Sequence, residues 1–450
     1  MKNKLKLEVE PIPSLVKSLA FPAITGMLVN AIYNVVDTFF VGKLNDSYAL
    51  GAVSIAFPTI MIITAIALTL GIGLGALLSR KLGEKNNDEA NSIFSTVILF
   101  SFFIGISIAV FGFFNTEFIC KIFGIDGTLK LYFKNFIKWI FIAAPFTTIN
   151  MCLNNSIRGE GNAKYSMHAL NLGAFINVIL DPIFIFYLNL GVSGAAIATG
   201  ISQFISTLFL LKFYLCNNSI IKFKIKKVKF RLKMFEELLI IGFPSFVRQM
   251  LVSTAVALVN SAASLFGPEA IAGLGVAMRI NSINVFVLFG LGQALQPIVA
   301  YNYGAKLFGR VKESINYTLK LANAFSILSS LFFMIFAKYL ISIFTKDVNI
   351  IHYGSLFLRG SALTFSLNGF QIIITTLFQS LGKGKYAFLT TSSRQGFFFI
   401  PFILILPKLI GFYGLPGTQI LGDIGGFSLA FYLYRKFKKE IHSKIQLIKK

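Results

Sequence analysis

The sequence predicts an all-α integral membrane protein with twelve transmembrane helices in two pseudo-symmetric six-helix lobes. Three observations predict it: an apolar composition, twelve membrane-length apolar runs, and an internal repeat. Hydrophobic residues make up 55% of the 450 residues and charged residues only 13%, whereas a soluble domain is usually about one-quarter charged. This composition argues against a soluble enzyme, a secreted disulfide scaffold and a nucleic-acid binder.

The twelve apolar runs define the predicted spans. A helix needs about 20 apolar residues to cross a bilayer, and each run reaches that length. They lie near 15–41, 50–79, 91–114, 137–157, 166–187, 192–215, 237–265, 270–301, 315–337, 353–380, 387–407 and 412–434. The connections between them are short, so little of the chain remains for a soluble domain.

The distribution of charge predicts orientation in the membrane. The chain has 42 Lys and Arg residues against 18 Asp and Glu residues, a net charge of +24. With a cytoplasmic N-terminus, one set of connections and tails carries 27 basic residues and the other set carries 8. The positive-inside rule then predicts both termini in the cytoplasm and a multi-pass protein of the inner (plasma) membrane.

These features divide the chain into five predicted segments. They are a cytoplasmic N-terminal segment 1–14, an N-lobe 15–216, a basic cytoplasmic linker 217–235, a C-lobe 236–434 and a basic cytoplasmic tail 435–450. The basic run in the linker is interpreted as a retention signal between lobes rather than a nucleic-acid site. It could also contact anionic lipid headgroups.

An internal duplication relates the two lobes. A shift of 221–222 residues places Phe21-Pro22 on Phe243-Pro244, Gly51 on Gly273, the segment Gly71–Gly83 on Gly292–Gly304, and the loop 161–165 on 382–386. Because each half has an even number of spans, both halves have the same orientation. Parallel repeats of this kind enclose a central cleft in transporters, so the repeat favours a transporter.

Acidic residues inside the spans indicate a mechanism. Fifteen of the 18 acidic residues lie in loops, in tails or at interfaces, and the other three are Asp37, Asp181 and Asp423. An ionisable group inside a membrane span is by default a functional hypothesis. Tyr33 precedes Asp37 by four residues and Asn177 precedes Asp181 by four, a spacing that places each pair on one helix face. Thr199 in the sixth span could add a hydroxyl to the same pocket.

Two carboxylates in a low-dielectric pocket cannot comfortably both stay ionised, so one must bind a proton or share a cation. Asp37, Asp181, Asn177, Tyr33 and Thr199 are therefore the predicted ion- or proton-coupling residues. The alternative is that each Asp caps a broken helix, which Pro182 after Asp181 makes credible. At the equivalent positions, the second half has Val259, Phe398 and Phe402, so the predicted site is confined to the first lobe.

The second lobe has a different polar set, from which Arg279, Gln293, Asp423 and Arg248 are the candidate substrate-cleft residues. Arg279 and Asp423 could form a buried pair, with either a structural or a substrate-binding role. Arg359 and Arg394 are expected to extend toward an interface. Some of the 50 Phe residues could line a cleft for flat organic cations, which ring faces attract.

Other site chemistries have no sequence support. The three Cys and three His residues are isolated, so no cofactor and no metal are predicted beyond H+ or a Na+ ion at Asp37, Asn177 and Asp181. Residues 79–88 lack the Gly-x-x-x-Asp-Arg-x-Gly loop of major-facilitator transporters, and motifs of prenyltransferases and membrane proteases are missing too. An enzyme is therefore not expected. A channel would not need a duplicated lobe that carries carboxylates, so a transporter is favoured, with a channel as an open alternative.

Four stretches resemble the multidrug and toxic-compound extrusion (MATE) family. They are Tyr33–Asp37, Ile176–Pro182, Gly191–Ala196, and Gly292–Pro297 continuing to Asn302–Gly304. The resemblance covers essentially the whole chain and is strongest toward a bacterial branch that includes a staphylococcal multidrug exporter. It implies export of small organic cations in exchange for inward H+ or Na+, with the five first-lobe residues at the ion site. We expect a monomer in the lipid bilayer.

One departure from the family limits what the resemblance implies. Some members carry acids in the seventh and eighth spans, where this chain has Arg248 and Arg279. A second ion site in the C-lobe is therefore not expected. The arginines also keep open an alternative function, a flippase of lipid-linked precursors from the same superfamily, because a diphosphate would need several converging arginines.

Overall fold

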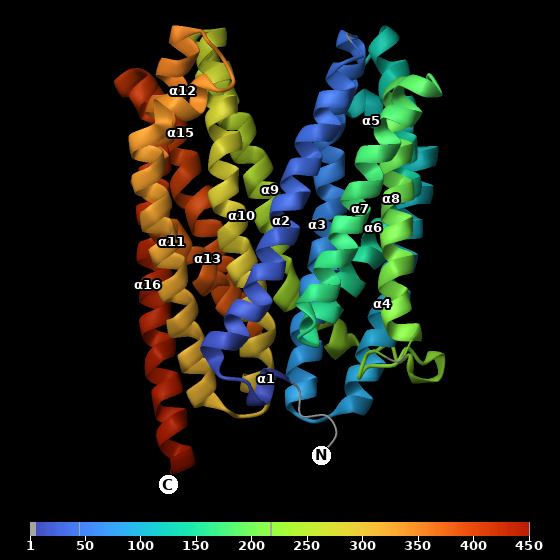
Figure 1. Cartoon of the computed structure of the whole chain (residues 1–450), viewed down its shortest axis with the longest axis vertical. Helices are drawn as coiled ribbons and strands as arrows, with labels where there is room; N and C mark the ends of the chain where they lie inside the picture. Colours follow the sequence, from blue (N-terminus) through green and yellow to red (C-terminus); the bar gives the residue numbers. More distant parts are fainter. Residues whose placement is uncertain (1–5, 45, 217, 450) are drawn as a thin grey trace. The chain divides into compact units, whose positions relative to one another are not determined.

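The computed structural model describes residues 6–44, 46–216 and 218–449, and every long regular element in them is a helix (Figure 1). The first half contains α1 (Lys6–Val9), α2 (Ile12–Gly42), α3 (Ser47–Gly83), α4 (Asn87–Phe114), α5 (Thr116–Ile122), α6 (Gly127–Gly159), α7 (Ala163–Pro182) and α8 (Gly191–Leu215). The second half contains α9 (Leu232–Ala263), α10 (Pro268–Gly304), α11 (Phe308–Ser342), α12 (Val348–Ala362), α13 (Phe365–Ser380), α14 (Gly384–Ser392), α15 (Phe399–Ile410) and α16 (Gly414–Lys449).

The helices account for the predicted spans. Ten helical segments of the described chain are long and apolar enough to cross a membrane, and α12 with α13, bent by 56°, forms an eleventh. One of the ten, Gly384–Gln446, has 63 residues. At about 1.5 Å per residue it is roughly three times the ~30 Å hydrocarbon thickness.

That long segment turns back on itself at Gly411, whose φ is 64°. A Cβ added at Gly414 would lie 2.4 Å from the Leu406 carbonyl carbon, so α15 and α16 pack closely against each other. Two crossings are therefore present in this segment, and the predicted architecture of twelve membrane helices is confirmed.

The chain forms two compact units whose boundaries fall inside helices. The first unit contains residues 21–242, and the second contains 6–20 with 243–450. Both boundaries coincide with the repeated Phe-Pro pairs, Phe21-Pro22 in α2 and Phe243-Pro244 in α9. Proline removes a main-chain hydrogen bond from a helix, which weakens continuity at these two points. The predicted lobe limits, 15–216 and 236–434, remain a prediction.

The described N-terminal residues pack in the second unit. Asn302 donates from Nδ2 to the Leu7 carbonyl at 3.1 Å, and Arg310 donates from Nη2 to the Glu10 carbonyl at 2.7 Å. Leu7 is fully buried. The segment predicted as cytoplasmic, 1–14, is thus bonded from residue 6 onward to the end of α10 and the start of α11.

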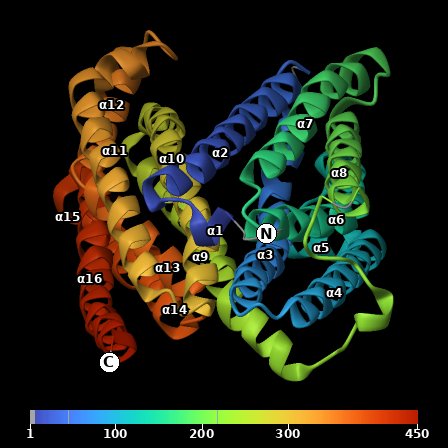
Figure 2. The same cartoon turned by 60° about the horizontal axis from the view of Figure 1, so that its bottom comes forward.

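The linker is also anchored, on the polar face at the start of α4. Four α4 side chains form hydrogen bonds with its main chain, at 2.7–3.0 Å. Asn91, Ser95 and Thr96 accept from the N–H groups of Lys222, Lys224 and Lys229, and the Ser92 hydroxyl donates to the Lys227 carbonyl. Figure 2 shows this stretch passing beside α4 on its way to α9. The polar residues at the start of α4 therefore satisfy main-chain groups of the linker.

A buried acid fastens the beginning of the linker. Glu160, directly after α6, is 7% exposed. Its Oε2 accepts hydrogen bonds from the Ser219 hydroxyl at 2.7 Å and from the Ile220 N–H at 3.0 Å. Burial raises the pKa of the Glu160 carboxyl to about 7, although these hydrogen bonds oppose the rise.

Glu160 predicts a pH dependence of stability. Because its pKa in the folded protein lies above the ordinary value of 4.5, the folded state binds this proton more tightly than the unfolded state does. The stabilisation is complete below about pH 4.5 and is lost as pH rises through about 7. Glu160→Gln should flatten the melting-temperature profile between these limits in detergent. Glu313→Gln, at an exposed position on α11, should retain the wild-type profile.

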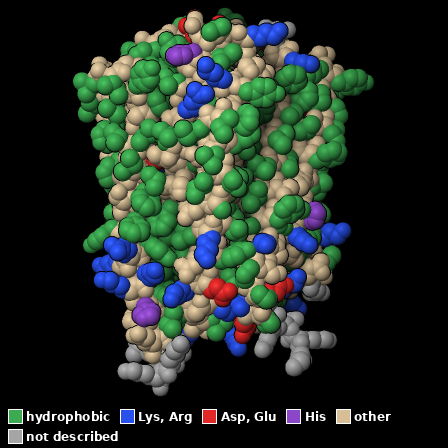
Figure 3. Space-filling model, turned by 60° about the vertical axis from the view of Figure 1, so that its left-hand side comes forward, with side chains coloured by type: hydrophobic (Ala, Val, Ile, Leu, Met, Phe, Trp, Pro, Cys, Tyr) green, Lys and Arg blue, Asp and Glu red, His purple; other side chains and the backbone are tan. Residues whose placement is uncertain are grey.

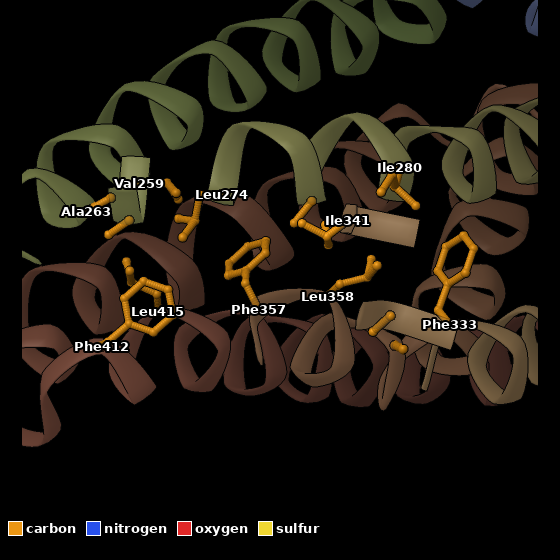
Figure 4. Close-up of a cluster of buried hydrophobic side chains, with 14 of the residues drawn as sticks. Val259, Ala263, Leu274, Ile280, Phe333, Ile341, Phe357, Leu358, Phe412 and Leu415 are labelled. Atoms are coloured by element: carbon orange, nitrogen blue, oxygen red, sulfur yellow. The ribbon is translucent and has the colours of Figure 1, made fainter. Parts of the chain in front are cut away.

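The second unit is built around an apolar core. Buried side chains from α9, α10, α11, α12, α15 and α16 form it, including Val259, Leu274, Phe333 and Phe357 (Figure 4). Ala and Gly residues let these helices approach closely, as is common between membrane helices. Residues 435–449, predicted as a tail, continue the last helix, α16.

Candidate functional site

Two carboxyl groups meet inside the first unit. Asp37 lies on α2 and Asp181 on the last turn of α7, and their side chains lie within hydrogen-bonding reach of each other. Asp181 is fully buried and Asp37 is partly buried. The structure therefore brings together the two acids that the sequence analysis assigned to one pocket.

The other three predicted residues surround this pair. In the orientation that satisfies both ends of its amide, Asn177 donates to Asp181 Oδ2 at 3.1 Å and accepts from the Thr199 N–H at 3.3 Å. The Tyr33 hydroxyl lies within hydrogen-bonding reach of the Thr199 side chain. Thus α2, α7 and α8 each contribute to one polar cluster, which we call the carboxyl site: Tyr33, Asp37, Asn177, Asp181 and Thr199.

One oxygen of the carboxyl site has no hydrogen-bond partner among the described residues. Asp37 Oδ1 is buried, and no described residue donates a hydrogen bond to it. A buried carboxylate oxygen without a donor is costly, and a second carboxyl group beside it adds like-charge repulsion. Binding a proton or a small cation would relieve both costs, so the arrangement suits a site that is charged in one state and neutralised in another.

The carboxyl site adjoins a small cavity of about 40 Å³. Tyr33, Asn177 and Thr199 line it, together with Asn150 of α6 and Ser206 of α8. Asp37 and Asp181 are not among the lining residues, so Asn177 connects the cavity to the acids. The volume suits one or two waters or a small ion.

Asn150 and Ser206 are residues that the sequence reasoning missed. Asn150 donates from Nδ2 to Ser206 Oγ at 2.9 Å, and Ser206 in turn donates to the Ala169 carbonyl at 2.9 Å. Polar residues recur at helical spacing along α8, at Thr199, Ser202 and Ser206. This spacing could have predicted from the sequence that α8 has a polar face.

The helix around Asp181 explains how this carboxyl is positioned. Pro182 follows it, and a single π-helical turn, Ile183–Tyr187, replaces the α-helix from that point. The Asp181 side chain contacts the side chains of Asn177 and Asp37. The coupling role of Asp181 and the helix-capping alternative both remain predictions.

The second unit has no equivalent polar cluster at the repeat-related positions. Val259, equivalent to Asp37, is 5% exposed within the apolar core (Figure 4). Phe398 packs so closely on α16 that a Cβ at Gly425 would lie 2.4 Å from its ring. The carboxyl site is therefore a feature of the first unit.

Asp423 forms a buried ion pair with a different arginine from the one that the sequence suggested. Its Oδ1 pairs with Arg394 Nε, Oδ2 accepts from the Thr364 hydroxyl, and Gln419 donates to Oδ1 at 3.3 Å. Asp423 is 1% exposed. The suggested Arg279–Asp423 pair is wrong, and so is the expectation that Arg394 extends to an interface.

The remaining second-unit residues do not converge with Asp423 in the contacts that the structure describes. Arg279 is exposed, and the Arg248 guanidinium lies over the Phe289 ring, 4.5 Å from its centroid. Arg359 donates from Nε to the Met334 carbonyl at 3.1 Å. Gln293 is partly buried on α10. The substrate-cleft role of Arg248, Arg279, Gln293 and Asp423 remains a prediction.

The ion pair predicts a large stability effect. Asp423→Ala leaves Arg394 buried without a counter-charge, which costs about 3–5 kcal/mol for a buried pair. We expect a low yield of folded protein and a reduced melting temperature in size-exclusion thermal assays. The double variant Asp423→Leu with Arg394→Met removes both charges and should recover most of the stability. Equal loss in the double variant would show that the pairing is not the cause.

Two units of membrane helices, one of which contains an intramembrane carboxyl site, define a membrane transporter. The MatE family model matches the chain twice, over residues 22–183 and 244–405. The two matches are separated by the shift of 222 residues that the repeat predicts. This chain therefore belongs to the MatE family of multi-pass membrane transporters, as the sequence motifs indicated.

The known proteins most similar to it include bacterial exporters. Multidrug export protein MepA of Staphylococcus aureus (strain MSSA476) is 27% identical over 416 residues, 92% of each chain. MepA of Staphylococcus haemolyticus (strain JCSC1435) is 28% identical over 431 residues, 95% of each. A solved outward-facing multidrug resistance MATE family transporter of the MOP superfamily matches with a TM-score of 0.93 at 24% identity, covering 98% of this chain and 100% of that one. The structural match supports the fold.

Proposed function

We propose that this protein exports amphipathic organic cations in exchange for inward H+ or Na+ by alternating access. The observation that carries the proposal is the carboxyl site, where two acids lie together and no described residue donates a hydrogen bond to Asp37 Oδ1. The sequence relationship to MepA proteins, named for multidrug export, supports the same function.

The carboxyl site suggests how coupling could operate. Ion or proton binding at Asp37 and Asp181 would remove their mutual repulsion and favour one conformation of the first unit. Pro22 in α2 provides a point at which that helix can rearrange. Release of the ion on the cytoplasmic side would restore the charge and reset the cycle. The ion must bind one conformation more tightly than the other, because an ion with equal affinity for both would not shift the equilibrium between them.

The side chains of this protein suit a cationic substrate better than an anionic one. It loses hydration on entry, which carboxylates and aromatic faces can replace. A lipid diphosphate would instead need converging arginines. Arg394 is neutralised by Asp423, and Arg248, Arg279 and Arg359 have separate surroundings. This favours the exporter over the flippase alternative.

The proposed setting is the inner (plasma) membrane, with both termini in the cytoplasm, on the basis of the distribution of Lys and Arg among the connections. We propose that a single chain is sufficient, because both lobes of the repeat are present in one polypeptide.

Substrate-driven efflux from inverted vesicles tests the proposal. A pH gradient and a Na+ gradient are imposed separately, and ethidium transport is followed by fluorescence. One gradient should drive transport and its dissipation should abolish it. In a pump-deficient bacterium, expression should raise resistance to quaternary ammonium compounds. Rescue of a flippase-deficient strain without any resistance shift would support the flippase alternative.

A further inference from the structure

A basic groove lies between α11 and α16, outside the proposed transport machinery. It encloses about 400 Å³ and is lined by Lys312 of α11 and by Arg435, Lys438, Lys439 and His442 of α16, with Ser443 and Gln446 beside them. None of the described residues that line it is acidic. We call this feature the α11–α16 groove.

The positive charges of the α11–α16 groove are not neutralised by the protein. Glu440 lies among them in sequence, but its carboxylate pairs with Lys383 and Lys444. In the described part of the chain, no carboxylate forms an ion pair with Lys312, Arg435, Lys438 or Lys439. Four cations around one hollow repel one another, and a bound anion would remove that repulsion.

The helix geometry places these cations where the apolar surface ends. Phe437 and Ile441 are buried at a four-residue spacing, while Arg435, Lys438 and Lys439 remain exposed. One turn earlier, Tyr432 is 65% exposed, and the Arg435 guanidinium lies over the ring of Phe431 at 5.3 Å. Exposed aromatic residues followed by basic residues are typical of the boundary between hydrocarbon and headgroups.

The surface in Figure 3 shows the same change from apolar to basic side chains. Its middle is largely hydrophobic, and Lys and Arg side chains gather toward its lower end. A ligand held at such a boundary can place a charged group among the cations and its apolar part along the hydrophobic surface. Free phosphate has no apolar part, so it would contact the cations but not the hydrophobic surface beside them.

We propose that the α11–α16 groove binds the phosphate headgroup of an anionic phospholipid from the adjoining leaflet, such as phosphatidylglycerol or cardiolipin. Lysine and arginine donate charge-assisted hydrogen bonds to phosphate oxygens, and basic pockets between membrane helices are known to hold such headgroups. The volume of the groove lies within the range of small-molecule sites, about 300–1,000 Å³.

Native mass spectrometry of the delipidated full-length protein tests this proposal. The protein is titrated with phosphatidylglycerol, cardiolipin and phosphatidylcholine, and bound lipids are counted. We expect the two anionic lipids to bind and phosphatidylcholine not to. Lys312→Gln/Lys438→Gln/Lys439→Gln should weaken binding by roughly a hundredfold, since each basic residue near an anionic lipid contributes about fivefold.

A matched variant controls for total charge. Lys164→Gln/Lys306→Gln/Lys385→Gln removes three exposed cations that do not line the groove, and it should bind lipid as the wild type does. If the groove variant fails to fold, Lys438→Gln alone should lose about fivefold. Equal weakening in the control, equal binding of phosphatidylcholine, or displacement of the lipid by millimolar inorganic phosphate would each overturn the proposal.

Discussion

Asp37→Asn is expected to abolish ion-coupled efflux while leaving folding and membrane insertion intact. An amide has nearly the same shape as a carboxyl group, but it cannot change charge when an ion or proton binds. The difference in ion affinity between conformations would therefore be lost, and the cycle would stall. The measurement is ethidium efflux in inverted vesicles at matched expression, with each gradient imposed separately.

The environment of Asp37 makes this variant a clean test. Its Oδ1 has no donor among the described residues, so an amide there breaks no hydrogen bond to that oxygen. A melting temperature close to that of the wild type would confirm that the fold is retained. Wild-type efflux from Asp37→Asn would remove Asp37 from the coupling mechanism.

Asp181→Asn is expected to abolish coupling as well, and no single substitution in the second unit should restore it. Asp181 is fully buried and contacts both Asp37 and Asn177, so its replacement removes the charge that makes the pair sensitive to an ion. Phe402→Asp introduces an acid at the repeat-related position, but without the surrounding polar groups. The double variant Asp181→Asn/Phe402→Asp should therefore remain uncoupled.

The comparison with Asp423 identifies which unit carries the coupling ion. Asp423 is already neutralised by Arg394, so its loss should act through stability rather than through coupling. The charge-free variant Asp423→Leu/Arg394→Met should retain gradient-driven efflux in proportion to its folded yield. If Asp181→Asn keeps its coupling while folded Asp423→Leu/Arg394→Met loses it, the coupling ion binds in the second unit and the proposed location is wrong.

Much of the fold was predictable because the membrane restricts the alternatives. Only helices of sufficient apolar length can cross a bilayer as single segments, and the predicted shift of about 222 residues also separates the two family matches. The carboxyl site was predictable for a related reason: acids are so rare in spans that Asp37 and Asp181 were distinctive. Their helical spacing to Tyr33 and Asn177 then indicated which neighbours share their faces.

The partner of Asp423 was not predictable, because it depends on local departures from α-helical geometry. Arg394 lies in a π-helical turn, Ser393–Phe398, and such a turn changes the face on which a side chain emerges. The bend between α12 and α13 brings Thr364 to the same carboxylate. Neither feature has a clear sequence signal, so the sequence alone did not indicate Arg394 as the partner of Asp423.

The crossing of α2 and α9 between the compact units has a consequence for how the duplication arose. Residues 232–242 belong to the first unit, where a Cβ at Gly242 would lie 2.0 Å from the Thr69 carbonyl oxygen; residues 6–20 belong to the second unit. An ancestral half-length chain with this arrangement would have been a domain-swapped homodimer, in which each copy lent its first helical segment to the other. Fusion of two such genes would have made that exchange intramolecular. Neither half, expressed alone, would then have its complete packing core.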